Sequence, residues 1–334
     1  MKIFKKIKYS ICILIIGLFL LHFLIVNPIY FWIDKSWLDI NSSSEKLKTH
    51  VSYLTETDQQ RDHNNNSRLN EVADYIKDEF TKNNCDSVLF QVFIANQKEY
   101  KNVICKFTWV NPKKIIVWAH YDVDWGWHSD ENLENKVFAW ADDNASGVAW
   151  LLELSRLIWE NKSELKNTIE FVWYTLEEMP HFHAGTMWSN IHAQSIKDSN
   201  EEIQYMISLE MIWFFSDEKI QKFPISLLKY IYPEEANFIA IIWRLQDRWL
   251  KNIKYFMQKY SNIDTWSLNA PTFVNEITRS DHKNYWNLWY EAYMITDTSF
   301  LRNKNYHKVT DTIDTLDFEK MNEVVKWVYG AITN

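Results

Sequence analysis

A short apolar run near the middle of the chain ends in residue types that bind metal ions. Residues 115–119 are apolar throughout, which is typical of a buried strand. His120 follows at once, and Asp122 lies two residues further on. After a polar loop, Asp143 stands just before a helical pattern over residues 146–158. Imidazole and carboxylate groups at a strand end and a helix start suit a divalent metal ion, because ligands bind at this edge of open α/β sheets.

The rest of the chain alternates between strand-like and helix-like segments. Strands are expected at residues 88–94, 103–108, 115–119, 168–174, 205–209, 238–242 and 292–295. Helices are expected at residues 44–54, 68–82, 146–158 and 317–329, and one more helix is expected to end at residue 260. Ser67 is the expected N-cap of the second helix. This alternation predicts an α/β three-layer sandwich, with a largely parallel, mixed central sheet flanked by helices.

Acidic groups recur where these strands end. Glu177 and Glu178 follow the fourth strand and Glu210 follows the fifth, as His120 follows the third. Clustered carboxylates repel one another unless a cation lies among them. Two metal ions bridged by one carboxylate would remove that repulsion. The pattern therefore favours a site for two metal ions.

Six short motifs occur in the order found in a known enzyme family. They are His120-Tyr121-Asp122, Ala141-Asp142-Asp143-Asn144-Ala145-Ser146-Gly147, Tyr174-Thr175-Leu176-Glu177-Glu178, Leu209-Glu210-Met211-Ile212, Ser280-Asp281-His282 and Tyr306-His307. Together they resemble the co-catalytic dizinc aminopeptidases of metallopeptidase family 28. The resemblance covers residue 115 to the C-terminus, and the ordered set is specific although each motif alone is weak.

The resemblance implies a site with two zinc ions. Its metal ligands would be His120, Asp143, Glu178, Glu210 and His307, with Asp143 bridging the two ions. Glu177 would be the general base. Asp122 would fix the orientation of the His120 imidazole, and Tyr306 would donate a hydrogen bond to the developing oxyanion.

Four other residues near these motifs have supporting roles in this interpretation. Ser280 and Asp281 belong to a motif beside the site, and we expect one of them to support a metal ligand. Asp311 and Asp317 are expected to be turn and helix-capping residues.

The predicted activity is that of a zinc-dependent exopeptidase of the aminopeptidase type. Three alternatives share the fold: a carboxypeptidase, a glutaminyl-cyclase-like enzyme with one zinc ion, and a non-catalytic, receptor-like ectodomain. The full two-metal ligand set, with His120 present, argues against the cyclase. Receptor-like domains of this fold tend to lose ligands, and here the set is complete. A zinc content of two, one or none per chain would separate these possibilities.

The N-terminus has the pattern of a membrane anchor. Lysines concentrate in residues 1–10, and the apolar residues 11–33 would extend about 35 Å as a helix. This length exceeds a bilayer core of about 30 Å, and the lysines favour the cytoplasmic side. We expect a single-pass anchor in the cell membrane at 11–33, a linker at 34–50 and a zinc peptidase domain outside the cytoplasm at 51–334. A cleaved signal peptide is the alternative.

The net charge indicates the kind of binding partner, and the cysteine content limits the possible disulfides. The net charge of −8 argues against a nucleic-acid partner, so a peptide substrate and the membrane are the expected ones. The chain has 3 cysteines, too few for a disulfide framework. Cys85 and Cys105 either pair in an oxidising compartment or remain two buried thiols.

The counts of tryptophan and glycine are both unusual. The chain holds 18 Trp and 5 Gly, whereas an ordinary usage of roughly 7% would give roughly 23 glycines. The two counts together make 23 residues. The resembled family has glycine at the positions of Trp118, Trp140, Trp188, Trp213, Trp243 and Trp289, and Trp125-Gly126-Trp127 resembles a glycine loop.

Some bacteria read the codon UGA as glycine, whereas other genetic codes read it as tryptophan. We therefore expect most of these tryptophans to be glycines in the living cell. Trp286 is expected to be genuine, because an aromatic residue suits its motif. The alternative is a tryptophan-rich protein whose indoles pack against one another.

Overall fold

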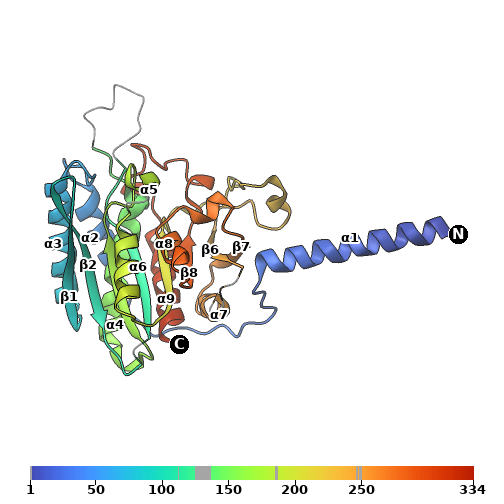
Figure 1. The fold of residues 1–334 in the computed structure, drawn as a ribbon, viewed down its shortest axis with the longest axis horizontal. Helices are drawn as coiled ribbons and strands as arrows, with labels where there is room; N and C mark the ends of the chain where they lie inside the picture. Colours follow the sequence, from blue (N-terminus) through green and yellow to red (C-terminus); the bar gives the residue numbers. More distant parts are fainter. Residues whose placement is uncertain (1, 112, 125–136, 185–186, 246, 248–249) are drawn as a thin grey trace.

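The computed structural model describes residues 2–111, 113–124, 137–184, 187–245, 247 and 250–334. Within them, a central sheet contains eight strands: β1 (Ser87–Ala95), β2 (Lys98–Phe107), β3 (Lys114–His120), β4 (Thr168–Tyr174), β5 (Ile203–Glu210), β6 (Phe238–Arg244), β7 (Asp264–Ala270) and β8 (Ala292–Thr296). Their order across the sheet is β1-β2-β4-β3-β5-β8-β6-β7 (Figure 1).

The sheet is mixed and has a parallel centre. β3 pairs in parallel with β4 and β5, β5 pairs in parallel with β8, and β6 pairs in parallel with β7. The β1–β2, β2–β4 and β6–β8 pairs are antiparallel. β3, β4, β6 and β8 are buried along their whole length, as expected for strands covered on both faces.

Helices cover both faces of the sheet. One face packs against α2 (Ser44–Thr55), α3 (Asn66–Lys82), α4 (Gly147–Glu160), α7 (Leu250–Lys259) and α9 (Phe318–Thr333) around one large apolar core. The other face packs against α6 (Trp188–Asp198) and α8 (His282–Asn287) around a second core. The short elements are η2 (Ala141–Ser146), η3 (Lys162–Glu164), α5 (His181–Ala184), η4 (Ser226–Tyr230), η5 (Asn275–Thr278), η6 (Ser299–Leu301) and η7 (Ile313–Thr315). The expected three-layer α/β sandwich is confirmed.

The start of α3 differs from the prediction. The helix begins at Asn66, and the side chain of Asn65 caps it by accepting a hydrogen bond from the Arg68 backbone N at 3.4 Å. The expected cap, Ser67, is wrong, because this residue lies within the first turn and its hydroxyl donates to Asn65 Oδ1 at 2.9 Å. The amide oxygen of Asn65, two residues before Ser67, already satisfies one of the free N–H groups of the helix start.

An apolar helix, α1 (Lys2–Val26), extends away from the body of the molecule (Figure 1). Its segment Tyr9–Val26 is long and apolar enough to cross a membrane, a property that signal sequences share. The base of α1 is attached to the edge strand β7. Ser267 Oγ donates to the Val26 carbonyl at 2.7 Å, and Asn269 Nδ2 donates to the Leu24 carbonyl at 3.0 Å.

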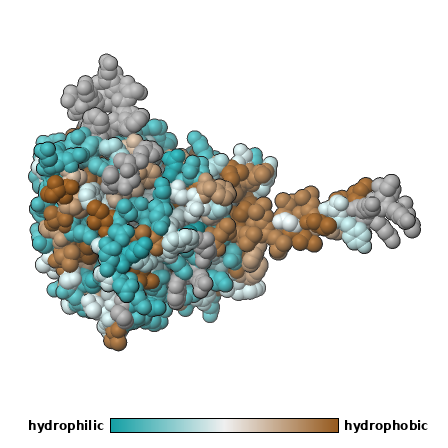
Figure 2. All heavy atoms as spheres, in the orientation of Figure 1, coloured by the Kyte–Doolittle hydropathy of each residue, from teal (hydrophilic) through white to brown (hydrophobic). Residues whose placement is uncertain are grey.

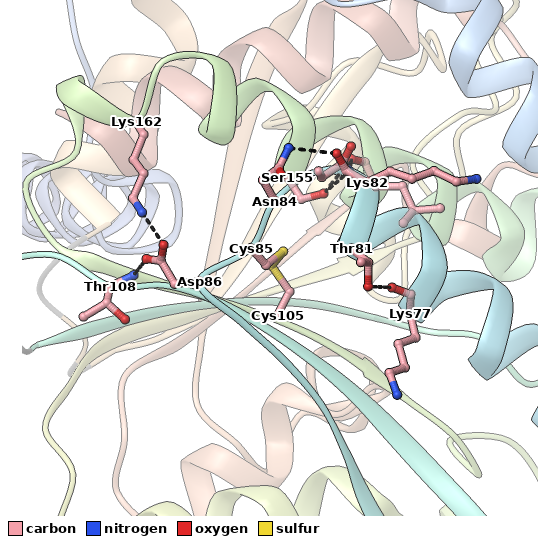
Figure 3. Close-up of a disulfide and its surroundings, with 12 residues drawn as sticks. Lys77, Thr81, Lys82, Asn84, Cys85, Asp86, Cys105, Thr108, Ser155 and Lys162 are labelled. Atoms are coloured by element: carbon pink, nitrogen blue, oxygen red, sulfur yellow. Dashed lines mark hydrogen bonds and ion pairs between the residues drawn. A yellow bond between two sulfur atoms is a disulfide. The ribbon is translucent and has the colours of Figure 1, made fainter.

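Cys85 and Cys105 form a disulfide (Figure 3). Their Cα atoms are 5.7 Å apart, and the bond joins the turn after α3 to β2. Beside it, Asp86 accepts a 2.7 Å hydrogen bond from the Thr108 backbone N and pairs with Lys162 (Figure 3). The segment Trp125-Gly126-Trp127 lies outside the described residues.

Candidate metal centre

Three neighbouring strands bring the predicted site residues to one edge of the sheet. β3 lies between β4 and β5, and the three strands run parallel, so their carboxyl ends coincide. η2 and the loop between β8 and α9 reach the same edge. The groups collected there are His120, Asp143, Glu177, Glu178, Glu210 and His307.

Asp143 lies between two imidazoles. His120 Nε2 is 3.4 Å from Asp143 Oδ1, and His307 Nε2 is 3.1 Å from Asp143 Oδ2. Each imidazole has a second carboxylate beside it. Glu210 Oε1 is 3.4 Å from His120 Nε2, and Glu178 Oε1 is 3.7 Å from His307 Nε2. Asp143 thus belongs to two groups. Each group contains one imidazole, Asp143 and one glutamate.

A carboxylate that the sequence pattern does not single out, Asp124, adjoins the second group. Asp124 Oδ2 is 3.3 Å from His307 Nδ1. One possible ligand atom from each of Asp124, Glu178 and His307 lies within 4.8 Å of the others. Asp124 is one acid in a polar loop, and only the folded chain brings it to His307.

Asp122 holds the glutamate pair in place. Asp122 Oδ1 accepts from the Glu177 backbone N, and Asp122 Oδ2 accepts from the Glu178 backbone N, both at 3.1 Å. His120 Nδ1 is 3.1 Å from the Asp122 carbonyl oxygen and 3.7 Å from its carboxylate. Asp122 therefore contacts the imidazole chiefly through its backbone and positions both glutamates through its side chain.

Buried polar groups also fix the backbone at Asp143. Asp311 accepts hydrogen bonds from the backbone N atoms of Asp142 at 3.0 Å and of Asp143 at 3.2 Å. Asp142 in turn accepts from Asn303 Nδ2 at 2.7 Å. Asp311, which the sequence suggests as a turn residue, therefore lies directly behind the shared carboxylate, whereas Asp317 caps α9 as expected.

The two candidate supporting residues differ in their distance from the site. Ser280 Oγ donates a 2.7 Å hydrogen bond to Glu210 Oε2, so it contacts a predicted ligand directly. Asp281 instead accepts a short hydrogen bond from Ser189. Ser280 is therefore the residue that orients Glu210.

The electrostatics of the site reflect crowded buried acids. Burial raises the pKa values of Glu177 and Glu178 well above the usual carboxyl range. Burial would raise the pKa of Asp143 as well, but the adjacent imidazoles of His120 and His307 lower it below its ordinary value. Burial would lower the pKa of His307, but Glu178 and other nearby carboxylates raise it to about 11. Divalent cations would supply the positive charge that these crowded carboxylates favour.

The donor set fits zinc. Imidazole nitrogen and carboxylate oxygen are preferred zinc ligands, with bonds of about 2.0–2.2 Å. Facing ligand atoms around Asp143 are 3.1 to 3.7 Å apart, the spacing expected around one such ion. His307 Nε2 is buried and makes no hydrogen bond with the described residues, although Asp143 Oδ2 is 3.1 Å away. A cation between these two atoms would satisfy both.

A cavity of about 590 Å³ opens beside these residues. Its size lies within the roughly 300–1,000 Å³ range of small-molecule sites. Tyr306 lines it, and the Tyr306 ring stacks on His307 with ring centroids 3.8 Å apart. Burial raises the pKa of the Tyr306 hydroxyl well above its usual value, so the hydroxyl remains a donor. The lining also contains apolar side chains, among them Ile242 and Met294.

Comparison with known proteins identifies the family. Residues 102–332 match the sequence profile of peptidase family M28. The chain is 36% identical over 299 residues to the uncharacterized protein YfbL of Escherichia coli (strain K12), across 88% of this chain and 89% of that protein. The chain belongs to peptidase family M28. It is also 25% identical over 228 residues to a probable leucine aminopeptidase 1 of Trichophyton verrucosum (strain HKI 0517). That alignment covers 67% of this chain and 54% of the fungal protein.

Solved structures of M28-like proteins share the fold. The LapA aminopeptidase of Legionella pneumophila has a TM-score of 0.66 at 17% identity, covering 87% of this chain and 71% of that one. The glutaminyl cyclase of Tannerella forsythia has a TM-score of 0.62 at 18% identity, covering 88% of this chain and 99% of that one. Family membership supports a hydrolase of the peptidase class and implies zinc, whereas the fold alone does not choose between hydrolysis and cyclisation.

Proposed function

We propose that this M28 protein is a membrane-anchored aminopeptidase that hydrolyses peptide bonds outside the cytoplasm with two zinc ions. One observation carries the proposal: Asp143 lies between the imidazoles of His120 and His307, and each imidazole has its own further carboxylate. This arrangement provides ligands for two cations that share one carboxylate.

The ligands divide into two sets around Asp143. His120, Asp143 and Glu210 would hold one zinc ion, and Asp143, Glu178 and His307 would hold the other. When bound, zinc polarises a substrate carbonyl and lowers the pKa of a bound water toward about 7. Asp124 would accept a hydrogen bond from His307 Nδ1 and so fix that imidazole.

Glu177 is the proposed general base. The side chain lies in the cavity, and the hydrogen bond from its backbone N to Asp122 fixes its position. Burial raises the pKa of Glu177, which improves the carboxylate as a proton acceptor near neutral pH. Glu177 would take a proton from the attacking water and pass it to the leaving amine.

Tyr306 and the apolar wall would bind the substrate. The Tyr306 hydroxyl, kept protonated by burial, is the proposed donor to the oxyanion that develops on the scissile carbonyl. The apolar wall around Ile242 and Met294 would receive an apolar N-terminal side chain, which agrees with the leucine aminopeptidase names of several relatives.

Two features support a location outside the cytoplasm. The N-terminal lysines precede a helix long enough to span a bilayer, and such lysines favour the cytoplasmic side. The chain forms a Cys85–Cys105 disulfide, and disulfides form and persist in oxidising compartments.

The test uses the full-length protein purified in detergent with zinc. We expect release of nitroaniline from leucine p-nitroanilide, and no release from the same compound acetylated on its amine. Peptides that begin with glutamine test for ring closure, because glutaminyl cyclases share the fold. Cyclisation without hydrolysis, or cleavage of the acetylated compound at the same rate, would overturn the proposal.

A further inference from the structure

Seven buried tryptophans have indole N–H groups that lack a hydrogen-bond partner among the described residues. They are Trp140, Trp150, Trp173, Trp188, Trp213, Trp243 and Trp327. Native proteins pair nearly all of their buried polar groups, because an unpaired donor loses its hydration without compensation. Trp286, which the sequence marks as genuine, differs from these seven. Its Nε1 donates to the Ala292 carbonyl at 2.9 Å.

Backbone conformation and packing also disfavour large side chains at several tryptophan positions. Trp140 has φ 49 and Trp289 has φ 69, in the left-handed region that glycine adopts without strain. Trp140 directly precedes the metal-site turn, and its ring centroid lies 4.9 Å from that of His307. The rings of Trp188 and Phe93 have centroids 3.2 Å apart, below the usual separation of about 4.5–7 Å for aromatic pairs.

We propose that most of the 18 tryptophans are glycines in the native protein, because its gene carries UGA codons that the cell reads as glycine. The unpaired indoles and the positive φ values support this proposal independently of the amino-acid composition. A glycine at Trp140 would relax the backbone next to Asp143 and uncover one side of His307.

Reading the gene and the protein tests this proposal. We expect UGA at the seven positions with unpaired indoles, UGG at Trp286, and glycine at those seven positions in peptide masses from the native cell. UGG at most of the seven, or tryptophan in the peptides of the native protein, would overturn the proposal.

A second inference concerns the surface around the base of α1. A further hydrogen bond holds this base, in addition to the bonds from β7. Lys254 Nζ donates to the Pro28 carbonyl at 2.8 Å. Beside it, Leu228 is buried against Val26. Nearby apolar side chains are exposed: Ile225, just before η4, by 52%, and Leu227 and Tyr230 within η4 by 69% and 77%.

These exposed side chains continue the apolar surface of the helix. Figure 2 shows hydrophobic residues covering both the base of α1 and the adjoining edge of the body. Contiguous exposed apolar patches of this kind mark contacts with membranes or partners. Because α1 itself is the proposed membrane span, the bilayer is the surface that lies next to this patch.

The metal-site cavity reaches this same region. Leu228, Tyr232 and Leu268 pack in the cluster at the base of α1, and all three also line the cavity. Glu178 and His307 of the proposed zinc site line the same cavity. The cluster at the base of α1 and the proposed zinc site therefore line the same cavity.

We propose that the patch formed by Ile225, Leu227 and Tyr230 rests in the outer interface of the bilayer, and that the enzyme trims peptides held at the lipid surface. The lipid contact rests on the proposed anchor, and the substrate class rests on the proposed peptidase function. None of the three patch residues is a tryptophan, so the inference is independent of the first one.

Fluorescence tests the lipid contact in the full-length protein, reconstituted in vesicles of phosphatidylethanolamine and phosphatidylglycerol. An NBD label is placed at Leu227→Cys or at Ile94→Cys on the opposite edge strand, each with Cys12→Ser. Both positions are similarly exposed, at 69% and 66%. We expect spin-labelled lipids to quench only the label at position 227, and aqueous iodide to quench mainly the label at 94. Equal quenching at the two positions would overturn the contact.

Kinetics test the substrate class separately. Leu227→Asp should lower turnover of a palmitoylated peptide in vesicles by about tenfold or more, because one apolar anchor is lost. Turnover of leucine p-nitroanilide in detergent should not change, because Leu227 does not line the cavity. Equal turnover of the palmitoylated peptide by both proteins would overturn the lipid-held substrate. Absence of all turnover in the parent would overturn the peptidase function but leave the quenching result valid.

Discussion

Replacing Trp140 by glycine distinguishes a native tryptophan from a native glycine by the size of the stability change. If tryptophan is native, removing this fully buried side chain should cost about 3–5 kcal/mol, as for other large-to-small core changes. If glycine is native, the change relieves an unpaired buried N–H, worth about 1–3 kcal/mol, and a left-handed backbone, worth about 1–3 kcal/mol. The loss of the buried side chain, about 3–5 kcal/mol, offsets this gain.

Trp140→Gly should therefore change the free energy of unfolding little. Trp286→Gly is the matched control, because Trp286 is also buried but its indole is paired. That change should cost about 3–5 kcal/mol. Urea unfolding followed by far-ultraviolet circular dichroism measures both, since tryptophan fluorescence changes with the substitution itself. A loss at Trp140 as large as that at Trp286 would refute the reasoning. If the chain as written does not fold, the reverse test starts from glycine at the seven positions and restores Trp140, which should then destabilise.

Further predictions concern the site, the disulfide and the anchor. Glu177→Gln should keep its zinc but lower kcat about 10²–10⁴-fold, whereas Glu178→Ala should lose metal, as plasma emission spectrometry and nitroanilide kinetics would show. Unchanged kcat in Glu177→Gln would contradict the assignment of the base. Cys105→Ala should lower the free energy of unfolding by about 3 kcal/mol, because the disulfide closes a loop with a sequence separation of 20; an unchanged urea midpoint would contradict this. The chain should sediment with membranes, and protease added outside should digest the region beyond residue 34; a soluble mature form beginning near residue 30 would show a cleaved signal peptide instead.

The central strands and most of the site could be predicted from the sequence, because both leave local signals. Parallel strands buried on both faces require continuous apolar runs, and the run that ends at His120 is one of them. Since such strands end at a common edge, residues that follow them in sequence meet in space. The two histidines on either side of Asp143 are an example, although His307 stands 187 positions after His120 in the sequence (307 − 120).

Other features depend on tertiary contacts that no local pattern records. β7 contains Ser267 and Asn269, and these polar residues suit an edge strand because they donate to the base of α1. α6 has a weak apolar pattern, since it covers only part of one face of the sheet. Asp124 and Asp311 are single acids in loops, and only the folded chain places one beside His307 and the other behind Asp143.

Zinc content measured together with activity tests the central claim most directly. The full-length protein is stripped with a chelator and titrated with zinc, while bound metal and hydrolysis of leucine p-nitroanilide are followed in the same samples. The two groups that share Asp143 predict binding of two zinc ions per chain and activity that becomes maximal at two equivalents. Saturation at one zinc ion per chain, or full activity without metal, would contradict a site in which Asp143 bridges two ions.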